Sequence, residues 1–176
     1  PGRGSYTKET LAYLKDRPLI SSDLQLMDQM RENLGFPSLS ELDFADQFKV
    51  SKHTKGEHAS PLIYACSKAD FLDINQEGFE VVAITGNSMG WYLALAFAES
   101  LPPADSFNLI QSMGAMMTNG LIGGQIIYPI VNKDWQMDPQ VENHILKLLD
   151  EINQSTEARA YLSIRLGGYF VLAGNK

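Results

Sequence analysis

A serine held between two glycines, in the stretch GNSMG at residues 86–90, constrains the fold of this chain more than any other feature. It follows the apolar run 81–84 and precedes the alanine- and leucine-rich run 91–98. This order predicts a strand, a sharp turn and a helix with Ser88 at the apex, as in a nucleophile elbow. Such a turn is so tight that Ser88 must adopt a strained backbone, and side chains larger than glycine at positions 86 and 90 would collide.

The predicted elbow gives Ser88 the surroundings that a nucleophilic hydroxyl needs. The hydroxyl would project from the sheet edge, and the N–H of Met89, at the N-terminus of the following helix, would point to where an oxyanion forms. The G-x-S-x-G pattern alone is weak evidence, and the flanking strand and helix are the context that supports it. The alternative is a strand-to-helix turn that needs glycine only for packing.

Composition excludes several classes of function. The chain has 176 residues and a net charge of −7, so a nucleic-acid-binding surface, which needs a basic face, is not expected. The single cysteine, Cys66, excludes an internal disulfide and favours a reducing compartment. No apolar run reaches the length of a membrane-spanning helix and no signal peptide is recognisable. We therefore expect a cytoplasmic protein with no membrane segment and no metal site.

Residues 1–122 carry the patterns of several helices around the elbow. Helical spacing of apolar residues predicts helices at 10–15, 22–34, 39–48, 60–74 and 104–118. Capping boxes at 22–25 and 38–41 mark two of the helix starts, and Ser60-Pro61 is the pattern of an N-cap followed by proline at the first helical position.

Two further patterns lie in this region. The polar segment 49–59, which includes His53 and His58, predicts an exposed loop. Met113 and Met117 lie at helical spacing in the last of the predicted helices, which indicates that they line the core or a pocket.

From residue 123 onward the pattern changes to strands around one helix. Asp138 precedes a proline and caps the helix. The predicted elements are a strand at 125–131, a helix at 139–154 and strands at 160–166 and 169–173. Two glycines separate the last two strands. This β-α-β-β order is the first part of a ferredoxin-like lobe. The sequence thus predicts a large α/β lobe at 1–122 and a partial ferredoxin-like lobe at 123–176.

Four short segments are similar, in the same order, to motifs of one enzyme family. PGRGS at 1–5 resembles P-G-Q-G-S, Ser60-Pro61 resembles Q-P, residues 86–95 resemble G-H-S-L-G-E-Y-x-A-L, and MGAMM at 113–117 resembles R-G-x-x-M. These motifs are those of the acyl-CoA:acyl-carrier-protein transacylases, best known as malonyl transacylases. The four together are far more specific than the elbow alone and extend over essentially the whole chain.

The resemblance implies a hydrolase-like three-layer α/β lobe with an inserted ferredoxin-like small lobe, in a chain truncated at both ends. It implies that Ser88 takes an acyl group, malonyl in the best-known members, from acyl-CoA and passes it to the phosphopantetheine thiol of an acyl carrier protein, in fatty-acid or polyketide synthesis. No tightly bound cofactor is implied. The backbone N–H groups of Met89 and Arg3 would form the oxyanion hole. The substrate pocket would be lined by Arg3, Asn87, Met113 and Met117.

Two departures from the family pattern bear on the substrate and the serine. The family arginine that pairs with the malonyl carboxylate is Met113 here, and methionine cannot make that bidentate contact. Either another cation, for which Arg3 is the candidate, holds the carboxylate, or the acyl group carries no free acid. The histidine that precedes the family's serine is Asn87 here.

A serine nucleophile also needs a general base. The family's base histidine follows the small lobe, in a region that these residues do not include. Of the histidines present, His53 and His58 fall in the predicted polar loop and His144 on a helix where it should face solvent, so none is expected to serve. The chain is therefore expected to be part of a longer polypeptide or an inactive relative.

Other functions remain open. A serine hydrolase, esterase-like or with the Ser-Asp arrangement of patatin, would use the same elbow, although the spacing of Asp70, Asp73 or Asp105 recommends none of them as the partner. A non-catalytic interaction domain would retain only the fold.

Carrier proteins are acidic, so docking one on this acidic chain requires a local basic patch. The candidate is the cluster of Lys49, Lys52 and Lys55. The alternative interpretation of this cluster is a solvated loop.

Overall fold

The computed structural model describes residues 2, 4–75, 77–119 and 123–175. Contacts divide the chain into two compact units, residues 1–120 and residues 121–176, and each is described here by itself. In the described residues no helix is both long and apolar enough to cross a membrane.

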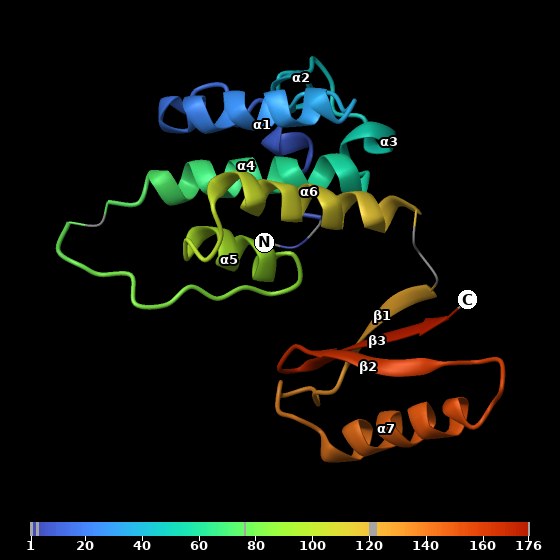
Figure 1. Ribbon diagram of the computed structural model, residues 1–176. Coiled ribbons are helices and arrows are strands. Elements are labelled where there is room, and N and C mark those ends of the chain that lie inside the picture. Colours follow the sequence, from blue (N-terminus) through green and yellow to red (C-terminus); the bar gives the residue numbers. More distant parts are fainter. Residues whose placement is uncertain (1, 3, 76, 120–122, 176) are drawn as a thin grey trace. The chain divides into compact units, whose positions relative to one another are not determined.

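The described part of the first unit consists of helices and connecting segments (Figure 1). Its closest packed pair is α4 and α6, which run side by side, and α6 also contacts α5. The elements are η1 (Lys8–Thr10), η2 (Pro18–Ile20), α1 (Ser21–Asn33), α2 (Leu39–Asp43), α3 (Val50–His53), α4 (Gly56–Leu72), α5 (Gly90–Phe97) and α6 (Pro103–Asn119).

Several predicted helix ends are confirmed and others are wrong. Ser38 accepts a hydrogen bond from the N–H of Glu41 at 3.0 Å and caps α2, as predicted. Gly35, with φ +76°, follows the end of α1, because only glycine adopts that conformation without steric cost. The capping box predicted at 22–25 is wrong, since α1 begins at Ser21 without a side-chain cap. The helix predicted at 10–15 is wrong: the 3-10 helix η1 ends at Thr10, residues 11–16 form turns, and Ala12 has φ +65°.

The largest correction concerns residues 49–61. The predicted exposed loop contains α3 and the start of α4, and Pro61 lies inside α4 rather than at its first position. Proline lacks an N–H, so it leaves the carbonyl of Glu57, four residues earlier, without its helical donor. Side chains from α1 and α6 supply that bond instead: Arg31 Nη1 at 2.8 Å and Gln111 Nε2 at 3.2 Å. Tertiary contacts therefore allow the helix to continue through the proline.

The strand predicted at 81–84 is not formed in the described residues. This run has no strand pairing, and its side chains are largely solvent-exposed, with Val82 88% exposed. A strand requires a neighbour for its backbone hydrogen bonds, and no described segment supplies one here. Apolar periodicity was therefore insufficient to define a strand at this position.

The second unit has the predicted β-α-β-β order. It consists of β1 (Gly123–Pro129), α7 (Pro139–Asn153), β2 (Ala160–Arg165) and β3 (Tyr169–Asn175). The strands form an antiparallel sheet in the order β1-β3-β2, and Figure 1 shows α7 along one of its faces. Asp138 caps α7 by accepting from the N–H groups of Gln140 and Val141, as predicted. Ile130, Ile145 and Phe170 form its buried core.

A buried carboxylate joins the N-terminal segment to α2 in the first unit. Asp43 is fully buried and accepts hydrogen bonds from the hydroxyl of Tyr6 at 2.6 Å and the N–H of Leu14 at 2.9 Å. Burial raises the pKa of Asp43, whereas both hydrogen bonds favour its charged form.

We expect Asp43→Ala to lower the free energy of unfolding by about 3 kcal/mol, because it leaves two buried donors without an acceptor at about 1–3 kcal/mol each. Urea unfolding at pH 7 measures the change. The matched control is Asp46→Ala, since Asp46 is exposed. Equal stability of the two variants would contradict the prediction.

Candidate functional site

The turn at residues 86–90 has the sharp apex and the following helix of an elbow, whereas the strand expected before it is not formed in the described residues. Ser88 is exposed and has φ +54°, in the left-handed region, which confirms the strained backbone predicted for it. The turn is closed by a hydrogen bond from the N–H of Gly90 to the carbonyl of Asn87 at 2.8 Å, and α5 begins at Gly90. The N–H of Trp91 donates to the carbonyl of Ser88 at 3.1 Å. The serine side chain is therefore presented to solvent at the start of a helix.

Gly86 is required by close packing within this turn. A Cβ at position 86 would lie 2.0 Å from the carbonyl oxygen of Gly90 and 2.1 Å from its carbonyl carbon. Such distances are far below van der Waals contact, and the obstructing atoms are backbone, so no side-chain adjustment relieves them. This confirms the predicted reason for glycine at position 86.

Met89 anchors the turn through its side chain. The residue is 7% exposed and belongs to the core cluster that also holds Leu93 of α5 and Ile63 of α4. Its N–H donates to no acceptor in the described part of the chain. The buried side chain of Met89 thus positions its backbone N–H next to Ser88, where that N–H is free of other described acceptors and can donate to an oxyanion. This is the arrangement needed for the oxyanion role predicted for Met89.

The second predicted oxyanion donor, Arg3, lies outside the described residues. Around it, the N–H and hydroxyl of Ser5 both donate to the carbonyl of Gly2, at 3.1 Å and 2.8 Å.

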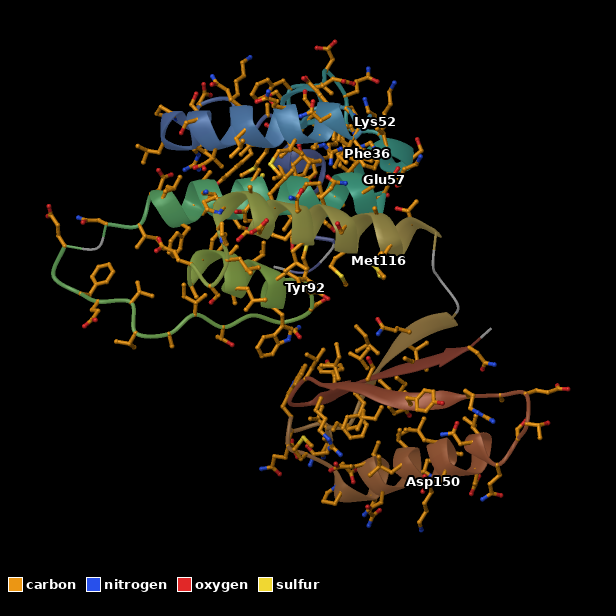
Figure 2. All side chains as sticks on the ribbon, viewed as in Figure 1. Phe36, Lys52, Glu57, Tyr92, Met116 and Asp150 are labelled. Carbon is orange, nitrogen blue, oxygen red and sulfur yellow. The ribbon has the colours of Figure 1, made fainter. Side chains whose placement is uncertain are left out.

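The remaining predicted pocket residues lie on two elements of the first unit. Asn87 is exposed on the elbow, Met113 is half-buried on α6, and Met117, also on α6, is 41% exposed. Figure 2 labels Met116, which lies beside Met117 on α6, and Tyr92 on α5. The elbow leads directly into α5, which packs on α6, so these residues belong to adjoining elements.

Two of the three histidines are not where the sequence predicted. His53 and His58 are buried, at 1% and 7% exposure, rather than solvated. His53 accepts from the N–H of Lys49 at 3.0 Å, and its Nε2 lies 3.0 Å from the carbonyl oxygen of Leu42. Burial, together with the charge of Arg31, lowers the pKa of His58. Polar composition suggested a loop here, but the His53 ring has backbone partners, and the Nε2 of the buried His58 lies 3.4 Å from the carboxylate of Glu57.

No general base for Ser88 is found within the described ranges. None of the three histidines hydrogen-bonds Ser88 there, and His144 is exposed on α7, as expected. Asp70 instead accepts from the hydroxyl of Tyr13, and Asp73 pairs with Arg17. These contacts give no support to a Ser-Asp dyad.

Sequence reasoning missed a buried polar cluster beside the predicted pocket helix. Arg31 is fully buried; its Nε donates to the carbonyl of Pro37 at 2.7 Å, and its Nη1 donates to Gln111 as well as to Glu57. Phe36 and Glu57, which both contact this guanidinium, are labelled in Figure 2. Burial lowers the pKa of Arg31 to about 10. The sequence signal was Pro61 four residues after Glu57, which leaves a carbonyl in need of a donor.

The matches that cover most of this chain are to solved structures. The acyl transferase domain of ZmaA has a TM-score of 0.76 at 16% identity and matches 99% of this chain and 39% of its own. A loading acyltransferase of the avermectin modular polyketide synthase has a TM-score of 0.74 at 15% identity, and the match covers 100% of this chain and 53% of that one. The malonyl-CoA:acyl-carrier-protein transacylase of Clostridium perfringens has a TM-score of 0.65 at 18% identity, and the match covers 99% of this chain and 51% of that one.

A curated relative adds a match in sequence. The non-reducing polyketide synthase nscA of Arthroderma gypseum is 32% identical over 93 residues, which are 53% of this chain and 5% of that protein. No family model matches. The chain spans about half or less of the length of these proteins. The structural matches confirm the predicted α/β fold class and agree with the family that the sequence motifs resemble.

We expect Gly86→Ala to lower the free energy of unfolding by about 2 kcal/mol, because the new Cβ forces the elbow open. Gly124→Ala is the control, since a Cβ there meets nothing within 4 Å. Thermal and urea unfolding compare the two. A Gly86→Ala protein as stable as the control would show that the close contact is not needed.

Proposed function

We propose that this chain, which has the fold of polyketide synthase acyltransferase domains and malonyl transacylases, is a serine acyltransferase. It would move an acyl group from coenzyme A to the phosphopantetheine thiol of an acyl carrier protein through an acyl-Ser88 intermediate. The observation that carries this proposal is the exposed Ser88, in a left-handed backbone, at a glycine-closed turn that opens a helix. Fold likeness to transacylases supports the class of reaction.

In the first half-reaction, the Ser88 hydroxyl attacks the thioester carbonyl while its proton passes to a general base. The carbon–sulfur bond then breaks and coenzyme A leaves as the thiol after taking up a proton. In the second half-reaction the carrier's thiol attacks the acyl-serine, the carbon–oxygen bond breaks and Ser88 regains its proton. The resemblance implies that the base is a histidine following the small lobe, and none of the described histidines contacts Ser88.

Both tetrahedral intermediates carry an oxyanion. We assign it to the N–H of Met89, which donates to no acceptor among the described residues, and to the N–H of Arg3. Because these are main-chain donors, the arginine in place of the family's glutamine preserves the role.

The acyl group is proposed to be malonyl, with Arg3 as the cation for its carboxylate because position 113 is methionine. An acyl group without a free acid is the alternative, and the apolar side chains of Met113 and Met117 favour it.

The carrier protein is proposed to dock near α3. Lys49 and Lys55 flank this helix and are exposed, whereas Lys52 pairs with Glu41 at 2.8 Å. Two exposed cations on one short segment suit an acidic partner. We place the reaction in fatty-acid or polyketide synthesis in the cytoplasm, and the match to a polyketide synthase supports the latter pathway.

The same observations are also compatible with two other functions. A serine hydrolase, esterase or patatin-like, would pass the acyl group to water from the same Ser88. A catalytically inactive relative would form no adduct at all.

The test is to incubate the protein, at its full natural length, with acyl-CoA and a phosphopantetheinylated carrier, and to record intact masses. We expect an acyl adduct on the protein and then on the carrier, both absent in Ser88→Ala. The control is Ser100→Ala, since Ser100 is exposed at the end of α5 and should load normally. Free acid without carrier loading would favour the hydrolase, and no adduct would favour the inactive relative.

Met113→Arg separates the two acyl classes. If the native pocket lacks a carboxylate anchor, this variant should raise malonyl over acetyl loading by about tenfold or more, because a bidentate ion pair becomes available. If the native protein already prefers malonyl, Arg3→Gln should remove that preference. Competition between the two thioesters, read as acyl-enzyme masses, measures both variants. A native malonyl preference that survives Arg3→Gln would exclude Arg3 as the anchor.

A further inference from the structure

Helices α4 and α6 meet where two glycines face each other. A Cβ at Gly56 would lie 2.3 Å from the carbonyl oxygen of Gly114, and a Cβ at Gly114 would lie 2.4 Å from the carbonyl oxygen of Gly56. Both residues are buried. Because the obstructing atoms are backbone, any larger residue at either position must push the helices apart. Glycine is needed here for the approach of two helices rather than for an unusual φ.

A polar clamp next to this contact, formed by Arg31, Gln111 and the Glu57 carbonyl, links α1, α4 and α6. The carbonyl of Glu57, freed by Pro61, accepts from Arg31 at 2.8 Å and from Gln111 at 3.2 Å, and Arg31 also donates to Gln111. Gln111 lies one helical turn before Gly114, and Glu57 follows Gly56. Since Arg31 and Gln111 are buried, breaking the clamp leaves charged and polar groups without partners.

The clamped stretch of α6 carries both predicted pocket methionines. Met113 directly precedes Gly114, and the Cβ of Met117 lies 3.2 Å from where a Cβ at Gly56 would be. Any change in the separation of α4 and α6 therefore moves both methionines.

We propose that the Gly56–Gly114 contact and the clamp at the Glu57 carbonyl set the depth of the acyl pocket, and so the length of acyl group that Ser88 accepts. Gly56, Gly114 and Gln111 act as positioning residues. This inference rests on the proposed function. A methyl group at either glycine needs α6 to move by about 1 Å, because non-bonded atoms pack at about 3.5 Å. Displacements of that size alter rates up to about 100-fold, and one methylene of pocket space changes selectivity at least about tenfold.

The test is single-turnover acylation of the full-length protein by an equimolar mixture of acetyl-, butyryl- and hexanoyl-CoA, read as acyl-Ser88 masses. We expect Gly56→Ala and Gly114→Ala each to raise the hexanoyl-to-acetyl ratio by about tenfold, because each new Cβ pushes α4 and α6 apart, from opposite sides of the same contact, and so deepens the proposed pocket. Ser112→Ala, at an exposed position of the same helix, is the control and should leave the ratio unchanged. Ratios within twofold of the wild type in both glycine variants would overturn the inference.

The clamp gives a second test if the alanine variants do not fold. Gln111→Leu removes both hydrogen bonds of Gln111 at similar volume and should shift the same ratio. Gln111→Glu keeps the acceptor for Arg31 but loses the donor to the Glu57 carbonyl, so it should shift the ratio less. A merely structural role would lower all acylation rates together and leave the ratio constant, which would overturn the inference. Wild-type protein that forms no acyl-Ser88 would instead overturn the proposed function, and the inference with it.

Discussion

Pro61 lies inside α4, and its missing N–H leaves the Glu57 carbonyl to be satisfied from outside the helix. Arg31 of α1 and Gln111 of α6 both donate to that oxygen, so one acceptor joins three helices. An unpaired buried carbonyl costs about 1–3 kcal/mol. Without the two donors, the Glu57 carbonyl would therefore destabilise α4. Pro61 therefore makes available the carbonyl through which α1 and α6 are hydrogen-bonded to α4.

The buried guanidinium of Arg31 follows from the same arrangement. Its hydrogen bonds are to two backbone carbonyl oxygens and to the side-chain amide of Gln111. Burial lowers its pKa, and the charges of Asp28, Glu57 and Glu41 partly offset that shift. The adjacent Gly56–Gly114 contact lets α6 come close enough for Gln111 to reach Glu57. The proline, the glycine pair and the arginine therefore all contribute to the contact between α4 and α6, the helix that carries Met113 and Met117.

The elbow at Ser88 depends on different physics. Its φ and the need for glycine at position 86 are local, since the atoms that collide belong to residues 86 and 90. The periodicity of the second unit is equally local, and the Asp138 cap, α7 and the last two strands were predicted close to their observed bounds. In contrast, polar composition at 49–59 wrongly suggested a loop, because His53 and His58 are buried by segments distant in sequence. The run 81–84 has strand composition but no pairing partner among the described residues.

By itself the sequence determined the strained serine turn, the helix caps at Ser38 and Asp138 and the β-α-β-β order, because each depends on residues within a few positions of one another. Only the tertiary structure decided that α4 continues through Pro61, that Arg31 is buried, and that two histidines lie inside the unit. Those outcomes depend on donors and packing surfaces up to 80 residues apart in the chain, such as Arg31 and Gln111. Hydrophobic periodicity and capping patterns report local geometry, and they carry no information about which distant side chain satisfies a buried polar atom.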